Sequence, residues 1–203
     1  MRKITLAAAA TAAVVVSGSP AAAGPPTLTE LRAALLTAAE APTGYRVAEA
    51  PQNMQLPIPL DRTLCDDDTS RDGEPETTLV VESLEEDGGT SVFTGIAAPG
   101  AFNARAFVTA VEKTPVRCPK ENGSTLTPLT LPALGDAAAG FRDVKPSVDG
   151  TSSESTVVAV ADGELVLLFE MSGGDESDRA EFLTLVAAAV GKAGRLPGQF
   201  SAA

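Results

Sequence analysis

Apolar residues near the C-terminal end of the chain follow two different patterns. The segment from Glu154 to Met171 holds two apolar runs separated by Asp162-Gly163, which is a typical turn sequence and predicts a β-hairpin. From Glu176 to Lys192 apolar residues recur every three or four positions, which predicts an amphipathic helix. Its apolar positions are Phe182, Leu185, Val186, Ala189 and Val190. Because residues 165–169 are all apolar, this strand needs cover on both faces, and we expect the helix to cover one.

The rest of the chain alternates between strand and helix patterns. A capping-box sequence at Thr27 to Glu30 starts a first helix, which we expect to end at Glu40. A second helix is predicted from Phe102 to Lys113. Further strands are predicted at residues 45–48, 77–85, 90–97, 125–131 and 137–144, and the proline-rich and acidic stretch 51–76 is predicted to be irregular. These elements predict an α+β fold with a mostly antiparallel sheet of about six strands and two or three helices packed against it.

Two windows of the chain resemble each other at an offset of 75 residues. Asp87-Gly88 aligns with Asp162-Gly163, and Phe107, Thr109 and Val111 align with Phe182, Thr184 and Val186. Both windows follow the order strand, turn, strand, helix, which indicates an internal ββα duplication. The alternative is a chance match between helices rich in alanine, valine and threonine. Duplication predicts that the two helices pack alike on one sheet.

The N-terminus has the pattern of an export signal. Arg2 and Lys3 precede an apolar stretch, and Ala21-Ala22-Ala23 is a small-residue cleavage sequence. We therefore predict a signal peptide over residues 1–23 and a single domain over residues 24–203. The alternative, an uncleaved membrane anchor, is disfavoured because the apolar stretch is short for a span. The expected location is extracellular, either released or associated with the cell wall.

Charge and composition exclude several functions. The formal net charge is -12, which disfavours nucleic acid as a partner, and no later stretch is long and apolar enough to span a membrane. Histidine is absent, so histidine-based triads and most transition-metal sites are excluded. Aromatic residues make up only 4% of the chain, which disfavours a glycosidase with a stacking platform for sugars. We expect no catalytic residue, cofactor or metal, and a protein that is not an enzyme.

The chain has two cysteines, and in an exported protein they most simply form a disulfide. We predict a Cys65–Cys118 bond, which would tie the acidic loop to the end of the second helix. In the chain-entropy model such a bond stabilises the fold by about 4 kcal/mol. The alternative is a redox-active pair, but the spacing is not that of a C-x-x-C motif.

Acidic residues around Asp68 match the first half of a calcium-binding loop. Asp68, Ser70 and Asp72 alternate ahead of Gly73, but the pattern then places Leu79 where a bidentate glutamate is needed. We therefore interpret this stretch as a solvated loop.

Three stretches together resemble the PknH-like family of actinobacterial extracellular sensor domains. They are Leu35 to Tyr45, Leu131 to Asp136 leading into Phe141-Arg142, and the terminal hairpin with its helix. The resemblance implies an α+β domain with an antiparallel sheet and a cleft for an unidentified ligand. The chain departs from the family in having no kinase, no membrane span and no lipidated cysteine, and one cysteine pair where members often have two. No site residue is carried over from the family.

These observations predict a secreted, monomeric, non-enzymatic binding module for an unidentified small molecule or envelope partner. We expect a cleft between the helices and residues 51–76, with Tyr45, Arg46 and Arg142 at its edge as candidate ligand contacts, because arginine in an acidic protein suits an anion. The alternative for the arginines is pairing with surface carboxylates. The alternative function is a carrier of hydrophobic envelope lipids, which needs a large apolar cavity. A secreted hydrolase is a third class and needs two converging carboxylates.

Overall fold

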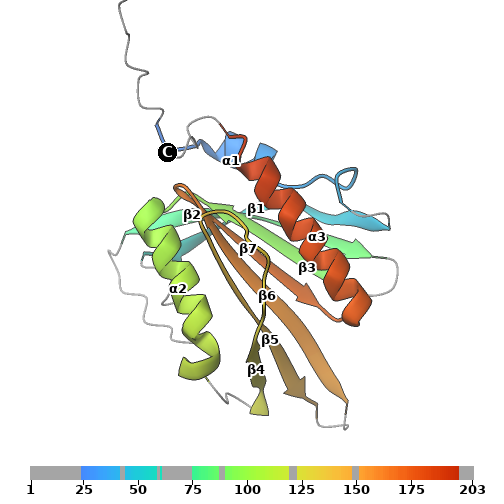
Figure 1. The fold of residues 1–203 in the computed structure, drawn as a ribbon. Coiled ribbons are helices and arrows are strands. Elements are labelled where there is room, and N and C mark those ends of the chain that lie inside the picture. The colour runs from blue at the N-terminus through green and yellow to red at the C-terminus, as the bar shows by residue number, and fades with distance from the viewer. Residues whose placement is uncertain are drawn as a thin grey trace, which may run out of the picture.

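A computed structural model describes residues 24–41, 44–58, 60, 75–86, 90–118, 123–147 and 151–196. They form one antiparallel sheet with three helices packed against it (Figure 1). The helices are α1 (Leu28–Ala34), α2 (Ala101–Arg117) and α3 (Glu176–Ala193). The strands are β1 (Tyr45–Pro57), β2 (Glu76–Glu86), β3 (Ser91–Ala97), β4 (Thr125–Pro128), β5 (Ala137–Pro146), β6 (Ser152–Asp162) and β7 (Leu165–Ser172). The predicted α+β class is confirmed, and the described sheet has seven strands instead of about six.

Strand β7 lies at the centre of the sheet, whose order is β1-β2-β3-β7-β6-β5-β4. Every neighbouring pair is antiparallel. The predicted hairpin is present, with β6 and β7 joined at a turn where Gly163 has a φ of 58° that glycine adopts without strain. The apolar run Leu165 to Phe169 belongs to β7 and contributes side chains to both hydrophobic clusters, which confirms that both of its faces are covered.

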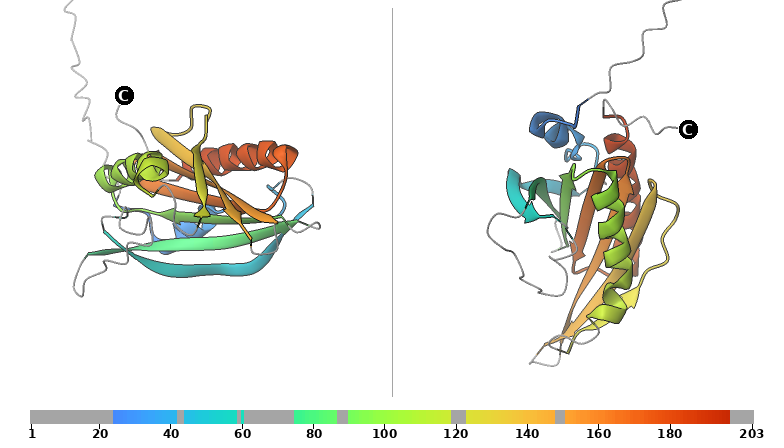
Figure 2. Two further views of the ribbon diagram at one scale, coloured as in Figure 1. Left: turned by 90° about the horizontal axis from the view of Figure 1, so that it is seen from below. Right: turned by 90° about the vertical axis from the view of Figure 1, so that its left-hand side faces the viewer.

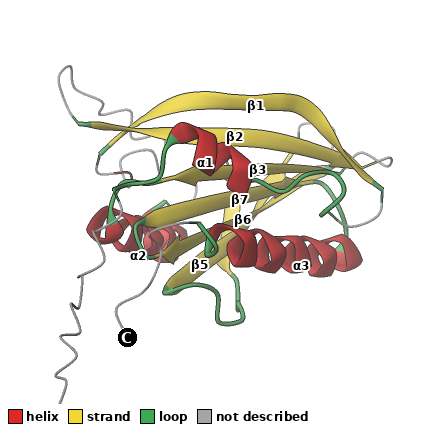
Figure 3. Cartoon of the chain, turned by 90° about the horizontal axis from the view of Figure 1, so that it is seen from above, coloured by secondary structure: helices red, strands yellow, loops and turns green. Residues whose placement is uncertain are grey.

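Helices α2 and α3 cover opposite faces of the sheet. Side chains alternate along each strand, so each central strand contributes apolar residues to both faces. On β6, Val158 and Val160 pack with α3 and α1, whereas Ala159 and Ala161 pack with α2. We call these the α3 face and the α2 face. In the left view of Figure 2, β5 rises between α2 and α3, and Figure 3 shows α1 over the β2–β3 part of the sheet.

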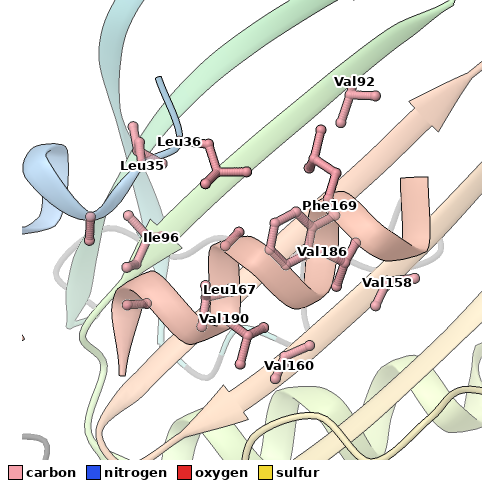
Figure 4. Packing of buried hydrophobic residues seen from close by; sticks show 14 of the residues in the cluster. Leu35, Leu36, Val92, Ile96, Val158, Val160, Leu167, Phe169, Val186 and Val190 are labelled. Atoms are coloured by element: carbon pink, nitrogen blue, oxygen red, sulfur yellow. The ribbon is translucent and has the colours of Figure 1, made fainter. Parts of the chain in front are cut away.

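The core of the α3 face is built from the helix positions that the sequence predicted. Phe182, Leu185, Val186, Ala189 and Val190 are all buried. Figure 4 shows Val186 and Val190 against strand residues that include Leu167, Phe169, Val158 and Val160, with Leu35 and Leu36 at the other side of the cluster.

The prediction that the two helices of the duplicated windows pack alike is wrong. Both windows do contain strand, strand and helix in the same order. However, Phe107 and Val111 of α2 join the cluster on the α2 face, whereas Phe182 and Val186 of α3 join the cluster on the opposite face. The two helices therefore share a sequence pattern without sharing a position on the sheet.

The first helix is shorter than predicted and ends at Ala34, not at Glu40. Its capping box is present, since Thr27 and Glu30 exchange side chain to backbone hydrogen bonds. After Ala34 the chain becomes extended at Leu35, and the carboxylate of Glu40 accepts hydrogen bonds from the backbone N–H and hydroxyl of Thr37. This local turn competes with the helix and ends it early.

Residues 51–57, predicted to be irregular, belong instead to the long edge strand β1. Proline lacks an N–H, so it is tolerated on an edge strand whose outer side needs no partner. The pairing of β1 with β2 also shifts register twice between Val47 and Gln52, as expected for bulges beside Pro51.

Candidate functional site

Three neighbouring strands change from apolar to polar on the α2 face, all toward the same end of the sheet. On each strand, the last apolar residue covered by α2 is followed, two positions along the same face, by a polar residue. The successive apolar and polar residues are Phe141 and Asp143 on β5, Val157 and Ser155 on β6, and Leu168 and Glu170 on β7. Pairing places Ser155 opposite Asp143 on one side and Ser172 on the other, and Glu170 lies two residues before Ser172 on the same face of β7.

A hollow of about 540 Å³ lies at this polar end of the sheet, and we call it the β5–β7 cleft. Its volume falls within the usual range for small-molecule sites, roughly 300–1,000 Å³. It is lined by Asp143, Lys145, Ser152, Ser153, Glu154, Ser155, Glu170, Ser172, Gly173 and Gly174. The lining holds serine hydroxyls, carboxylates and one ammonium group, and so is suited to a polar ligand.

Two carboxylates of the cleft have unused capacity to accept hydrogen bonds or charge. The Oδ1 atom of Asp143 is buried and has no hydrogen-bond partner within the described chain. Burial raises the pKa of Glu170, and the charge of Asp143 raises it further. An unpaired buried oxygen costs free energy, so a donor at this position would be stabilising.

The third carboxylate, that of Glu154, is already paired. Arg142 donates to both of its oxygens from Nε and Nη2, and Arg179 of α3 donates to Oε1. Hydrogen bonding from Arg142 is the main reason why the pKa of Glu154 is lowered. These three residues, the Glu154 network, attach the first turn of α3 to the sheet beside the cleft.

The structure places the predicted ligand contacts in different parts of the sheet. Tyr45 is buried in the core of the α3 face, and burial raises the pKa of its phenol. Arg46 is exposed, with its Nη2 atom 2.8 Å from a carboxylate oxygen of Glu85. Arg142 lies on β5, which four strands separate from β1, and it binds Glu154, a residue of the cleft lining. The pairing of Arg46 and Arg142 with carboxylates is the alternative that the sequence had left open.

The cleft residues Asp143, Ser155 and Glu170 were missed by sequence reasoning. A signal was present in the run Ser152 to Ser155, which makes the start of β6 polar on both faces. Its meaning depends on which residues of β5 and β7 lie opposite, and pairing register cannot be read from one strand alone.

The predicted disulfide and the predicted acidic loop both involve residues outside the described ranges. Cys118 is buried at the C-terminal end of α2, but Cys65 and the loop at Asp68 lie outside the described residues. The Cys65–Cys118 bond therefore stays a prediction, as does the solvated loop. The signal peptide at residues 1–23 also lies outside the described residues.

Two classes of feature are not found in the described part of the chain. No group of three or more cysteine, aspartate or glutamate residues there could hold a metal ion. None of the described helices is long and apolar enough to cross a membrane.

Comparison with solved structures reveals the same fold in an extracellular domain. The extracellular domain of PknH from Mycobacterium tuberculosis superimposes with a TM-score of 0.52 at 16% identity, over 83% of this chain and 98% of that domain. A putative uncharacterized protein from Mycobacterium smegmatis, an Rv0999 ortholog, gives a TM-score of 0.46 at 11% identity, over 76% of this chain and 92% of that one. The chain matches no protein-family model and no curated protein. The resemblance inferred from sequence is thus confirmed as a shared fold with the PknH domain.

Proposed function

We propose that this chain is an exported, non-enzymatic binding module of the sensor type, and that its ligand site is the β5–β7 cleft. The observation that carries the proposal is the cleft itself, whose polar groups converge from three strands and include a buried Asp143 oxygen that has no partner among the described residues. The fold shared with the extracellular domain of PknH favours an extracellular role. The predicted export signal at residues 1–23 agrees with that location.

A binding role fits the cleft better than covalent catalysis does. Several serines line it, but the chain has no histidine that could activate a serine hydroxyl as a nucleophile. Asp143 and Glu170 stand on strands that are separated by β6. Both residues line the cleft, so a ligand in it can contact both carboxylates.

The carrier of hydrophobic ligands, our alternative function, has weaker support. A second hollow, of about 290 Å³, lies at the loop between β4 and β5 and is lined by residues 129 and 131–138. Its leucines Leu129, Leu131 and Leu134 pack against the core of the α3 face. This hollow is at the lower limit for a small-molecule site and is small for a lipid chain.

A blocking variant tests the proposed site. Ser155 lies between Asp143 and Ser172, so Ser155→Phe should fill the cleft, whereas Thr109→Phe on the exposed side of α2 is the matched control. Saturation-transfer NMR against a panel of small polar metabolites should detect binders of the natural chain that the control keeps and Ser155→Phe loses. Equal binding by both variants would exclude the cleft.

Native mass spectrometry of the protein purified from its own host separates the two functions. A lipid retained by the purified protein would favour the carrier over the polar module. A small polar adduct that disappears in Ser155→Phe would favour the module.

A further inference from the structure

We propose that the β5–β7 cleft recognises a primary ammonium group, received by the carboxylates of Asp143 and Glu170. This inference rests on the proposed function and specifies its ligand chemistry. It follows from the charge of the cleft, from its unused hydrogen-bond acceptors and from its size.

The cleft carries an excess of negative charge that its own residues do not balance. Three acidic residues and one lysine line it. The Glu154 carboxylate lies on the α3 face, where two arginines compensate it, so Asp143 and Glu170 remain. Neither of them joins a salt bridge within the described residues, and Lys145 is exposed at the rim. A ligand that enters between the two carboxylates is therefore favoured if it carries positive charge.

The hydrogen-bond acceptors of the cleft require a donor. An ionised carboxylate only accepts, and the buried Oδ1 atom of Asp143 has no hydrogen-bond partner in the described part of the chain. An ammonium has three N–H donors and no acceptor, so one group can satisfy both carboxylates and a serine hydroxyl such as that of Ser155. A neutral hydroxyl could donate to Asp143 but would leave the negative charge of half-buried Glu170 uncompensated.

A primary amine also suits the cleft better than a bare cation. Calcium takes roughly six to eight oxygen ligands, and no group of three metal-binding side chains is present among the described residues. The volume of about 540 Å³ instead accommodates an amine with a carbon skeleton, such as an amino sugar or a lysine side chain. The ammonium chemistry is common to both sources, and the test distinguishes them.

The test is a titration followed by ¹H–¹⁵N NMR of the folded protein at pH 7, with charged and neutral forms of the same probes. Glucosamine is compared with N-acetylglucosamine, and the amide of Nα-acetyl-lysine with its Nε-acetylated form. We expect the charged probes to shift the amides of Asp143, Ser155 and Glu170 and the neutral forms to bind at least about 5-fold more weakly. The charged probe that binds more tightly identifies the source of the amine.

Three cleft variants and one control make the test specific. Asp143→Asn and Glu170→Gln should each weaken binding of the charged probe about 5-fold or more, because each removes an attractive charge. Lys145→Gln should strengthen it about 2-fold by removing a like charge at an exposed position, where folding is not at risk. Glu85→Gln, on the exposed Arg46 pair, should leave it unchanged.

Three kinds of result would overturn the inference, and they differ in what they imply for the proposed function. If neutral forms or acetate occupy the cleft as well as the amines do, the ammonium inference fails while the proposed site stands. If the charged probes shift no cleft amide and no polar metabolite shows binding that Ser155→Phe abolishes, both proposals fail. Unchanged affinity in Asp143→Asn and Glu170→Gln would also overturn the inference.

Discussion

Arg179 of α3 donates a hydrogen bond to the carboxylate of Glu154 on β6, and this ion pair joins the helix to the strand that borders the cleft. The same carboxylate also accepts from Arg142, so a single acidic side chain holds two guanidinium groups. Because only 18% of the Glu154 side chain is exposed, water can replace these contacts only in part. The stability of this end of the fold should therefore depend on Glu154.

Replacing Glu154 by glutamine should destabilise the protein by about 1–3 kcal/mol at pH 7. The variant keeps the shape of the side chain but leaves two arginines facing a neutral group, and the Nε atom of Arg179 already has no partner within the described ranges. Urea unfolding measures the loss. The matched control is Glu85→Gln in the exposed Arg46 pair, which should change stability by less than about 0.5–1 kcal/mol. Equal losses in the two variants would contradict a special role for the network.

The pH dependence of this loss has a definite sign. The pKa of Glu154 is lowered in the folded protein, mainly by hydrogen bonding from Arg142. Its stabilising effect is therefore present above the unfolded pKa and is lost as the pH falls through the folded value. The difference in the free energy of unfolding between the natural chain and Glu154→Gln should therefore become smaller in acid.

The contact between Lys192 and Glu40 should make the docking of α3 sensitive to strong acid. Lys192 Nζ lies 2.6 Å from the Glu40 carboxylate and also donates to the backbone oxygen of Leu35. The hydrogen bond from Lys192 is the largest cause that lowers the pKa of Glu40 to about 2. Stability from this pair should be complete above the unfolded pKa of Glu40 and disappear as the pH falls toward about 2. A double-mutant cycle of Glu40→Gln and Lys192→Met should give a coupling at pH 7 that vanishes near pH 2.

Glu82 should affect the pH dependence of stability in the opposite direction to Glu40. It is 7% exposed on β2, and burial raises its pKa, with nearby Lys192 opposing the rise in part. A carboxyl whose folded pKa is raised stabilises the fold below the unfolded pKa, and this stability is lost as the pH rises through the folded value. Glu82→Gln should therefore be more stable than the natural chain at pH 7, and the difference should shrink toward pH 4. A less stable Glu82→Gln at pH 7 would show that the carboxylate has a favourable role.

The parts of this fold that sequence predicted are those that local patterns determine. The Asp162-Gly163 hairpin and the buried face of α3 follow from periodicity over a few turns or strand residues, and the cap at Thr27 follows from a four-residue motif. Strand β1 was missed beyond Ala48, because an exposed edge strand with Pro51 has neither alternation nor a buried run.

The parts that sequence could not predict depend on contacts between distant segments. The repeated pattern in α2 and α3 does not encode which face of the sheet each helix covers, since both helices need only an apolar surface. The cleft could not be predicted for the same reason. Asp143, Ser155 and Glu170 come from three strands and are brought together only by the pairing register. Tyr45 and Arg46 looked as suitable as Arg142 in sequence, but of the three only Arg142 binds a residue of the cleft lining, Glu154.

Asp136 holds the loop between β4 and β5 in place. Asp136 Oδ2 accepts from Arg105 Nη2 at 3.0 Å and from the backbone N–H of Gly163 at 3.2 Å, so it attaches the loop to α2 and to the β6–β7 turn. Hydrogen bonding from Arg105 is the main reason that the pKa of Asp136 is lowered. This contact requires the preceding residue, Gly135, to lie directly against β6.

Gly135→Ala should destabilise the protein by about 2–4 kcal/mol. Gly135 has a φ of 52°, and an added Cβ would lie 2.5 Å from the backbone oxygen of Ala161 and 2.9 Å from Val160 Cγ1. The backbone of β6 cannot yield without breaking its pairing, so the loop must move and Asp136 must lose its contacts. The matched control is Gly191→Ala in α3, where nothing lies within 4 Å and alanine should gain about 0.5–1 kcal/mol. Thermal unfolding should move in opposite directions for the two variants, and a Gly135→Ala melting temperature at or above that of the natural chain would show that the loop does not need this close approach.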